Sequence, residues 1–199
     1  LGDYNKALEY NLQLLKIYEK THGKEHPTYA IILNNIALNY SDLGDYKKAL
    51  EYNLQALSII KKTLGNDHQD YATISDHIAV NYYYLGDCNK ALEYSLQALS
   101  IKVKTLGKEH PDYAMSLNNI ASNYSDLGYY NKSLEYNLQA LSIKEKTLGK
   151  EHPDYATSLN NIALDYSDLG YYKKALKCNL QALKISEKTL GKEHPDYAI

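Results

Sequence analysis

Histidine is the residue type whose spacing in this chain most invites a metal site. Five of the seven histidines recur every 42 residues: His26, His68, His110, His152 and His194. Copies of one position in a stack of repeated helices lie on the order of 10 Å apart, whereas a bond from zinc to an imidazole nitrogen is about 2 Å long. The five histidines therefore cannot share one ion. We predict that they cap helices or pack in loops, and that the chain holds no metal.

Nucleophilic and phosphate-binding chemistry also lacks its usual arrangement of residues. Cys88 carries a thiol that could act as a nucleophile, but the repeat brings no histidine and acid to it. The glycines recur singly, as helix stops, without a Gly-rich phosphate loop or a Gly-x-Ser-x-Gly elbow. The sequence therefore predicts a protein that is not an enzyme and needs no cofactor.

Charge and cysteine content narrow the classes of partner. The formal net charge of −2 favours neither nucleic acid nor an anionic membrane, and no apolar run approaches the roughly 20 residues that span a bilayer. Cys88 and Cys178 make no disulfide framework and are typical of free thiols in a reducing compartment. We expect a cytoplasmic protein whose partner is a protein or peptide, with no nucleic-acid or membrane partner.

One internal repeat of 42 residues runs through the chain. Residues 85–126 and 127–168 differ at only eight of these 42 positions. A fixed period of this size predicts stacked units, each of which buries its apolar face against the next. We expect one continuous array over residues 1–199, taken from a longer one, with these parts: a partial repeat at 1–27, full repeats at 28–69, 70–111, 112–153 and 154–195, and the start of a further helix at 196–199.

Each repeat has the pattern of two helices. In the third full repeat, Pro111 suits the first turn of a helix, where its missing N–H costs nothing, and His110 would be the cap. Apolar residues then recur at helical spacing until Leu127, and Gly128 supplies the turn. A second helix of about 18–20 residues follows and stops at Gly149. Four full periods and a partial one predict about nine helices.

The repeat resembles the tetratricopeptide repeat (TPR). The resemblance is carried by a small/aromatic pattern: Leu33, Ile36, Ala37, Tyr40, Leu43, Gly44, Tyr46, Ala49 and Ala56. The usual period of that family is 34 residues, and the longer form here is similar to the repeats of kinesin light chains, at residues 148–156 and 159–163. The resemblance implies an all-α, right-handed superhelical solenoid of antiparallel helix hairpins. It also implies that the first helix of each hairpin lines a concave groove for peptide segments.

The resemblance and the phase of the repeat together assign groove positions. The side chains expected to contact a peptide are Asn34, Leu38, Asp76, Tyr83, Asn118, Ser122, Asn160 and Leu164. An amide offers both donors and an acceptor, so the first Asn of each Asn-Asn pair could hold an extended backbone. The alternative is that these asparagines are solvated or bind a neighbouring helix end.

Charge at the groove positions points away from acidic partners. Kinesin light chains recognise acidic, Trp-containing motifs with basic groove residues, whereas this chain places Ser41, Ser125 and Ser167 there, with aspartates alongside and no arginine. We therefore expect a neutral or mildly basic peptide. A second polar series, Asn11, Asn53, Ser95, Asn137 and Asn179, lies near the buried stripe of the second helices, and we predict structural hydrogen bonds to an adjacent backbone.

Some questions stay open at the level of sequence. The repeat at 70–111 departs most from its neighbours, with Asp76-His77 and Tyr82-Tyr83-Tyr84, and is either a specialised groove patch or the result of drift. The favoured function is a non-catalytic interaction scaffold. The alternatives are a regulatory or sensor array of a larger enzyme or signalling protein, and a module that self-assembles head to tail.

Overall fold

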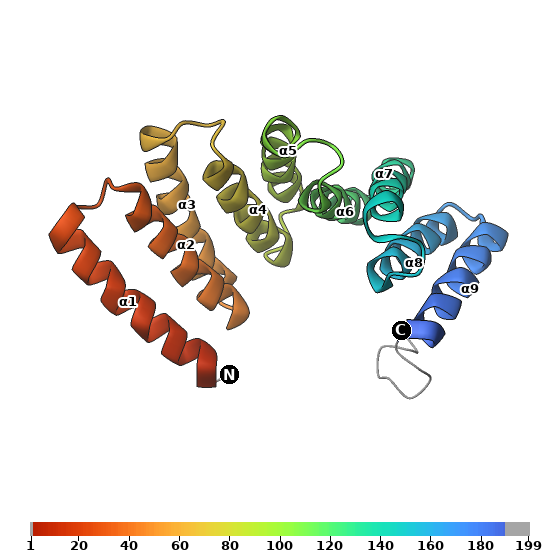
Figure 1. Cartoon of the computed structure of the whole chain (residues 1–199), viewed down its shortest axis with the longest axis horizontal. Coiled ribbons are helices and arrows are strands. Elements are labelled where there is room, and N and C mark those ends of the chain that lie inside the picture. The colour runs from red at the N-terminus through yellow and green to blue at the C-terminus, as the bar shows by residue number, and fades with distance from the viewer. Residues whose placement is uncertain (1, 190–199) are drawn as a thin grey trace. The chain divides into compact units, whose positions relative to one another are not determined.

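The computed structural model describes residues 2–189, which form nine α-helices and no β-strand. Figure 1 labels the helices along the chain. Their bounds are α1 (Gly2–His22), α2 (Pro27–Asp42), α3 (Tyr46–Thr63), α4 (Gln69–Tyr84), α5 (Cys88–Thr105), α6 (Pro111–Asp126), α7 (Tyr130–Leu148), α8 (Pro153–Asp168) and α9 (Tyr172–Thr189). The prediction of an all-α chain of helix hairpins is confirmed for these residues.

The repeated histidines start the first helix of each hairpin. His26, His68, His110 and His152 are the N-caps of α2, α4, α6 and α8, and the Nδ1 atom of each accepts a hydrogen bond from the backbone N–H two residues on, at 3.1 to 3.2 Å. This bond satisfies one of the N–H groups that a helix start leaves without an intrahelical partner. The predicted capping role of these four histidines is confirmed. His194 and the helix expected at 196–199 lie outside the described residues.

We expect His152→Ala to lower the free energy of unfolding by about 1 kcal/mol, the usual cost of losing a capping side chain. His152→Asn is the matched control, because its side-chain oxygen can accept the same bond from Asp154 N–H. Urea unfolding of the two variants checks this, and equal destabilisation by both would show that the imidazole matters for another reason.

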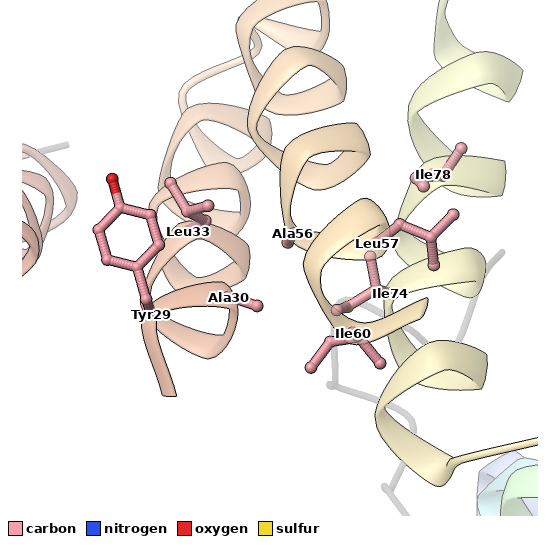
Figure 2. Close-up of a cluster of buried hydrophobic side chains, with 8 residues drawn as sticks. All are labelled: Tyr29, Ala30, Leu33, Ala56, Leu57, Ile60, Ile74 and Ile78. Carbon is pink, nitrogen blue, oxygen red and sulfur yellow. The ribbon is translucent and has the colours of Figure 1, made fainter. Parts of the chain in front are cut away.

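Hydrophobic clusters lie between successive helices that pack together within one part of the chain. Figure 2 shows one cluster, shared by α2, α3 and α4: Tyr29, Ala30, Leu33, Ala56, Leu57, Ile60, Ile74 and Ile78. Small residues recur where helices approach closely, and Ala37, Ala49, Ala121 and Ala163 are all buried, as the sequence predicts. Between the two helices of a hairpin, Gly44 and Gly128 adopt φ of 81° and 78°, which favours glycine.

The chain divides into two compact units. The N-terminal unit spans Leu1–Thr105 and contains α1 to α5, and the C-terminal unit spans Leu106–Ile199 and contains α6 to α9. In the C-terminal unit, Tyr155, Ala156 and Leu159 of α8 pack against α9 and against Leu141 of α7. The single continuous array and the repeat boundaries stay predictions. No helix within residues 2–189 has the length and apolar character that would carry it across a membrane.

Candidate functional site

Charge is divided between the two kinds of helix. We call α2, α4, α6 and α8 the first helices and the others the second helices. The first helices contain no lysine, and their carboxylates are Asp42, Asp70, Asp76, Asp112, Asp126, Asp154, Asp165 and Asp168. The lysines of the described chain lie on the second helices and in loops. The first helices therefore contribute carboxylates and no ammonium group to the unit in which each lies.

A polar hollow opens in the C-terminal unit between α6, α7 and α8. Its volume is about 200 Å³. Its lining consists of amides, hydroxyls and carboxylates with one leucine: Asn118, Ser122, Ser125, Asp126, Ser133, Asn137, Asn161, Leu164 and Asp165. Ser122 and Leu164 are exposed, Leu164 by 65 %. The hollow therefore offers both hydrogen-bonding groups and an apolar side chain to a ligand.

Asp165 is a buried carboxylate in the lining of the hollow. Its side chain is only 2 % exposed. Oδ1 accepts a hydrogen bond from Ser133 Oγ at 2.5 Å, and Oδ2 accepts one from Asn137 Nδ2 at 2.7 Å. Burial raises the pKa of the Asp165 carboxyl above its ordinary value and the charge of Asp168 also raises it, whereas the bonds from Ser133 and Asn137 lower it.

Hydrogen bonds continue from Asp165 to a lysine of α7. Asn118 Nδ2 donates to Asn137 Oδ1 at 2.9 Å, and Asn118 Oδ1 accepts from Lys144 Nζ at 2.9 Å. Lys144 also donates to Ser158 Oγ at 2.8 Å and to the carbonyl of Asp154 at 3.4 Å. Burial lowers the pKa of Lys144, and the carboxylate of Asp154 opposes this. Two amides thus separate the buried carboxylate from the ammonium group.

Asp165 and Ser133 both depart from the repeat, and they depart together. The position of Asp165 is occupied in the other repeats by Asn39, Asn81 and Asn123, and the position of Ser133 by Ala7, Ala49, Ala91 and Ala175. Sequence analysis missed Asp165, although this coincidence of two changes was a usable signal. The two departing residues bond directly to each other.

The polar series on the second helices bonds differently from the prediction. Asn137 donates to the Asp165 side chain, and Asn11 Nδ2 donates to Asn39 Oδ1 at 3.2 Å in the N-terminal unit. The predicted backbone partners are therefore wrong for these two residues, because the next first helix presents a side chain at this point. Asn53 Oδ1 is buried without a hydrogen-bond partner among the described residues.

The groove residues expected from the sequence fall into two groups. In the N-terminal unit, Asn34 is buried with Oδ1 2.7 Å from His77 Nδ1, and Asp76 forms an ion pair with Lys102. Burial lowers the pKa of His77, and the charge of Lys102 lowers it further. Leu38 is half-buried, and Tyr83 meets Tyr84 edge to face with ring centroids 5.6 Å apart.

In the C-terminal unit the hollow brings three of the expected residues together. Asn118, Ser122 and Leu164 line it, whereas Asn160 is half-buried and is not part of the lining. The second Asn of that pair, Asn161, lines the hollow instead. Of the three expected residues, Asn118 is engaged in internal hydrogen bonds, which leaves Ser122 and Leu164 as the accessible ones.

Comparisons with known proteins agree with this architecture. The family model described as "Tetratricopeptide repeat" matches residues 1–62, 33–102, 70–146 and 112–188. Among solved structures, the nearly identical TPR-like repeats of an inferred kinesin light chain from Podosopora anserina are 29 % identical, with 97 % of this chain and 90 % of that chain covered and a TM-score of 0.82. BtubC (BKLC) from P. vanneervenii is 24 % identical, with 98 % and 77 % covered and a TM-score of 0.86. The apo form of RapI is 21 % identical, with 95 % and 68 % covered and a TM-score of 0.79. A search of curated proteins gave no match.

Proposed function

This chain belongs to the tetratricopeptide repeat family, whose arrays are in general protein-interaction scaffolds, and we propose that α6 and α8, the first helices of its C-terminal unit, hold an extended peptide. The observation that carries the proposal is the hollow between α6, α7 and α8, which is open to solvent at Ser122 and Leu164. The proposed activity is binding without chemistry.

The lining suits a peptide in physical terms. An extended backbone needs partners for its N–H and C=O groups, and the hollow presents amides and hydroxyls that can donate and accept. Asn118 has a second N–H after donating to Asn137. Leu164 is an exposed apolar side chain in the lining. Met115, which lies one turn before Asn118 on α6, is 56 % exposed. Apolar side chains of a peptide could pack on both residues. These groups support a peptide ligand with both polar backbone contacts and apolar anchors.

We expect Ser122→Trp to block the hollow and to weaken peptide binding by on the order of tenfold or more, which corresponds to about 1.4 kcal/mol. The probes are peptides selected on the unmodified chain from a displayed library of random short peptides. Ser142→Trp is the matched control, because Ser142 is an exposed serine of α7 in the same unit but on a second helix. The chain has no other tryptophan, so indole fluorescence also reports binding in each variant.

Ser122 is a sharper probe than Asn118, since a change at Asn118 would also release Asn137 and Lys144 from their hydrogen bonds. A library that yields no binder, or binders that tolerate both tryptophans equally, would contradict the groove proposal. The regulatory and self-assembly alternatives stay predictions, because no contact among the described residues distinguishes them.

A further inference from the structure

We propose that the hollow receives a basic side chain of the bound peptide, a lysine ammonium or an arginine guanidinium, with the Asp165 carboxylate as its counter-ion. This inference rests on the proposed function and specifies the chemistry of its ligand. It starts from a charge that the chain itself leaves uncompensated.

Asp165 is a buried acid whose bonded partners are all neutral. Its two oxygens accept from a hydroxyl and an amide, and among the residues that the structure describes no lysine or histidine forms an ion pair with it. A buried charge is costly unless it is paired. Asp76 at the position equivalent to Asn118 shows the usual solution, since it pairs with Lys102 of the facing second helix. Asp165 lacks such an internal cation and lines an open hollow.

Lys144 does not take this role. Its ammonium is held by Asn118, Ser158 and the carbonyl of Asp154, none of which is the carboxylate of Asp165. A carboxylate has room for about four hydrogen bonds on its two oxygens, and each oxygen of Asp165 accepts one from the protein. The remaining acceptor capacity suits the donors of an ammonium or guanidinium group.

The carboxylates that α6 and α8 place around the hollow favour a cation. On α6, Asp126 lines the hollow; on α8, Asp168 acts on Asp165; and the α7 residues in the lining, Ser133 and Asn137, are neutral. Asp126 and Asp168 are the last residues of their helices, where the helix dipole is negative, and neither last turn contains a basic residue. Carboxylates at this end oppose helix stability. The same placement concentrates negative potential where a ligand cation would enter.

The size of the hollow agrees with one long side chain. The hollow of about 200 Å³ exceeds the roughly 150 Å³ of an engineered cavity that accepts benzene. Long basic side chains lay their methylene stems along apolar surface while the charged head finds polar partners. Leu164, which is exposed, and Asp165, which is buried, both line the hollow and supply these two surfaces.

The experiment compares peptides with and without their charge on two variants. The probes are the library-selected peptides, each also made with acetyl-lysine in place of lysine and citrulline in place of arginine. We expect these neutral forms to bind the unmodified chain roughly ten- to a hundredfold more weakly, the value of a hydrogen bond to a charged group. Asp165→Asn should weaken the charged peptides by a similar factor and leave the neutral forms unchanged.

Two features keep this test decisive. Asn is the residue of the other repeats at this position, so Asp165→Asn is compatible with the fold. Asp154→Asn is the matched control, because it removes the same charge from the exposed first turn of the same helix and should not discriminate between the peptides. Equal loss of charged and neutral peptides with Asp165→Asn would mean a structural role and would overturn the inference.

The remaining outcomes separate this inference from the proposed function. Binders that lack lysine and arginine, or that tolerate neutralisation, overturn the inference and leave the peptide groove standing. Failure to select any binder overturns both. The last outcome concerns salt. If KCl displaces the charged peptides more strongly than tetramethylammonium chloride does at equal ionic strength, the hollow binds a small inorganic cation instead, and the inference is overturned.

Discussion

Leu117→Ala is expected to lower the local free energy of unfolding of the C-terminal unit by about 2–5 kcal/mol. Leu117 lies in the middle of α6 and has no exposed surface. Truncation removes its buried methyl groups and leaves a cavity that the surrounding helices fill only in part. Because stability in a repeat protein is close to a sum of local terms, the loss should be largest for amides of the C-terminal unit. Native-state hydrogen exchange measures this helix by helix.

Met115→Ala provides the control for that substitution. Met115 lies two residues before Leu117 on the same helix but is 56 % exposed, so its truncation should change stability by less than about 0.5 kcal/mol. Similar losses for the two variants would mean that α6 is not packed as the structure has it.

Local features of the fold were predictable from the sequence because they depend on neighbours along the chain. His110 with Pro111 marks a helix start and Gly128 marks an end, and both act within one turn of helix. The repeat then copies each assignment four times, which averages out errors at single positions. Because these signals are local and repeated, a TPR-type, all-α chain could be predicted from the sequence, and this prediction is confirmed.

The chemistry of the hollow was harder to predict because it depends on contacts across repeats. Ser133 and Asp165 are 32 residues apart and meet only when α7 packs against α8. The resemblance and the phase of the repeat placed Asn118 in the expected groove but could not show that the ammonium of Lys144 bonds to its amide oxygen. One clue was present: Lys144 occupies the position of Ile60, which is fully buried in the first full repeat. A lysine in a core position must turn its ammonium group towards polar partners.

Asp165→Asn restores the residue of the other repeats and is expected to stabilise the C-terminal unit near pH 7, by on the order of 1 kcal/mol, and to lose this advantage in acid. Burial raises the pKa of Asp165 in the folded chain above the ordinary value of 3.8. Between these two pKa values the folded state binds more protons than the unfolded state, so stability falls as pH rises through that interval. Well below pH 3.8 the carboxyl is neutral in both states and carries no charge penalty. Above the raised pKa the penalty is present in full.

Asparagine has no such charge, so the difference between the variant and the unmodified chain isolates the titration of this one group. Hydrogen exchange or urea unfolding over a pH series measures it, with Asp154→Asn as the control on the same helix, for which we expect no comparable rise in stability at neutral pH. A stabilising effect that is independent of pH would show that packing, not charge, decides the result. A destabilising effect at pH 7 would mean that the bonds from Ser133 and Asn137 outweigh burial. The expected combination, greater stability with weaker binding of basic peptides, would identify Asp165 as a residue that costs the fold stability and contributes recognition.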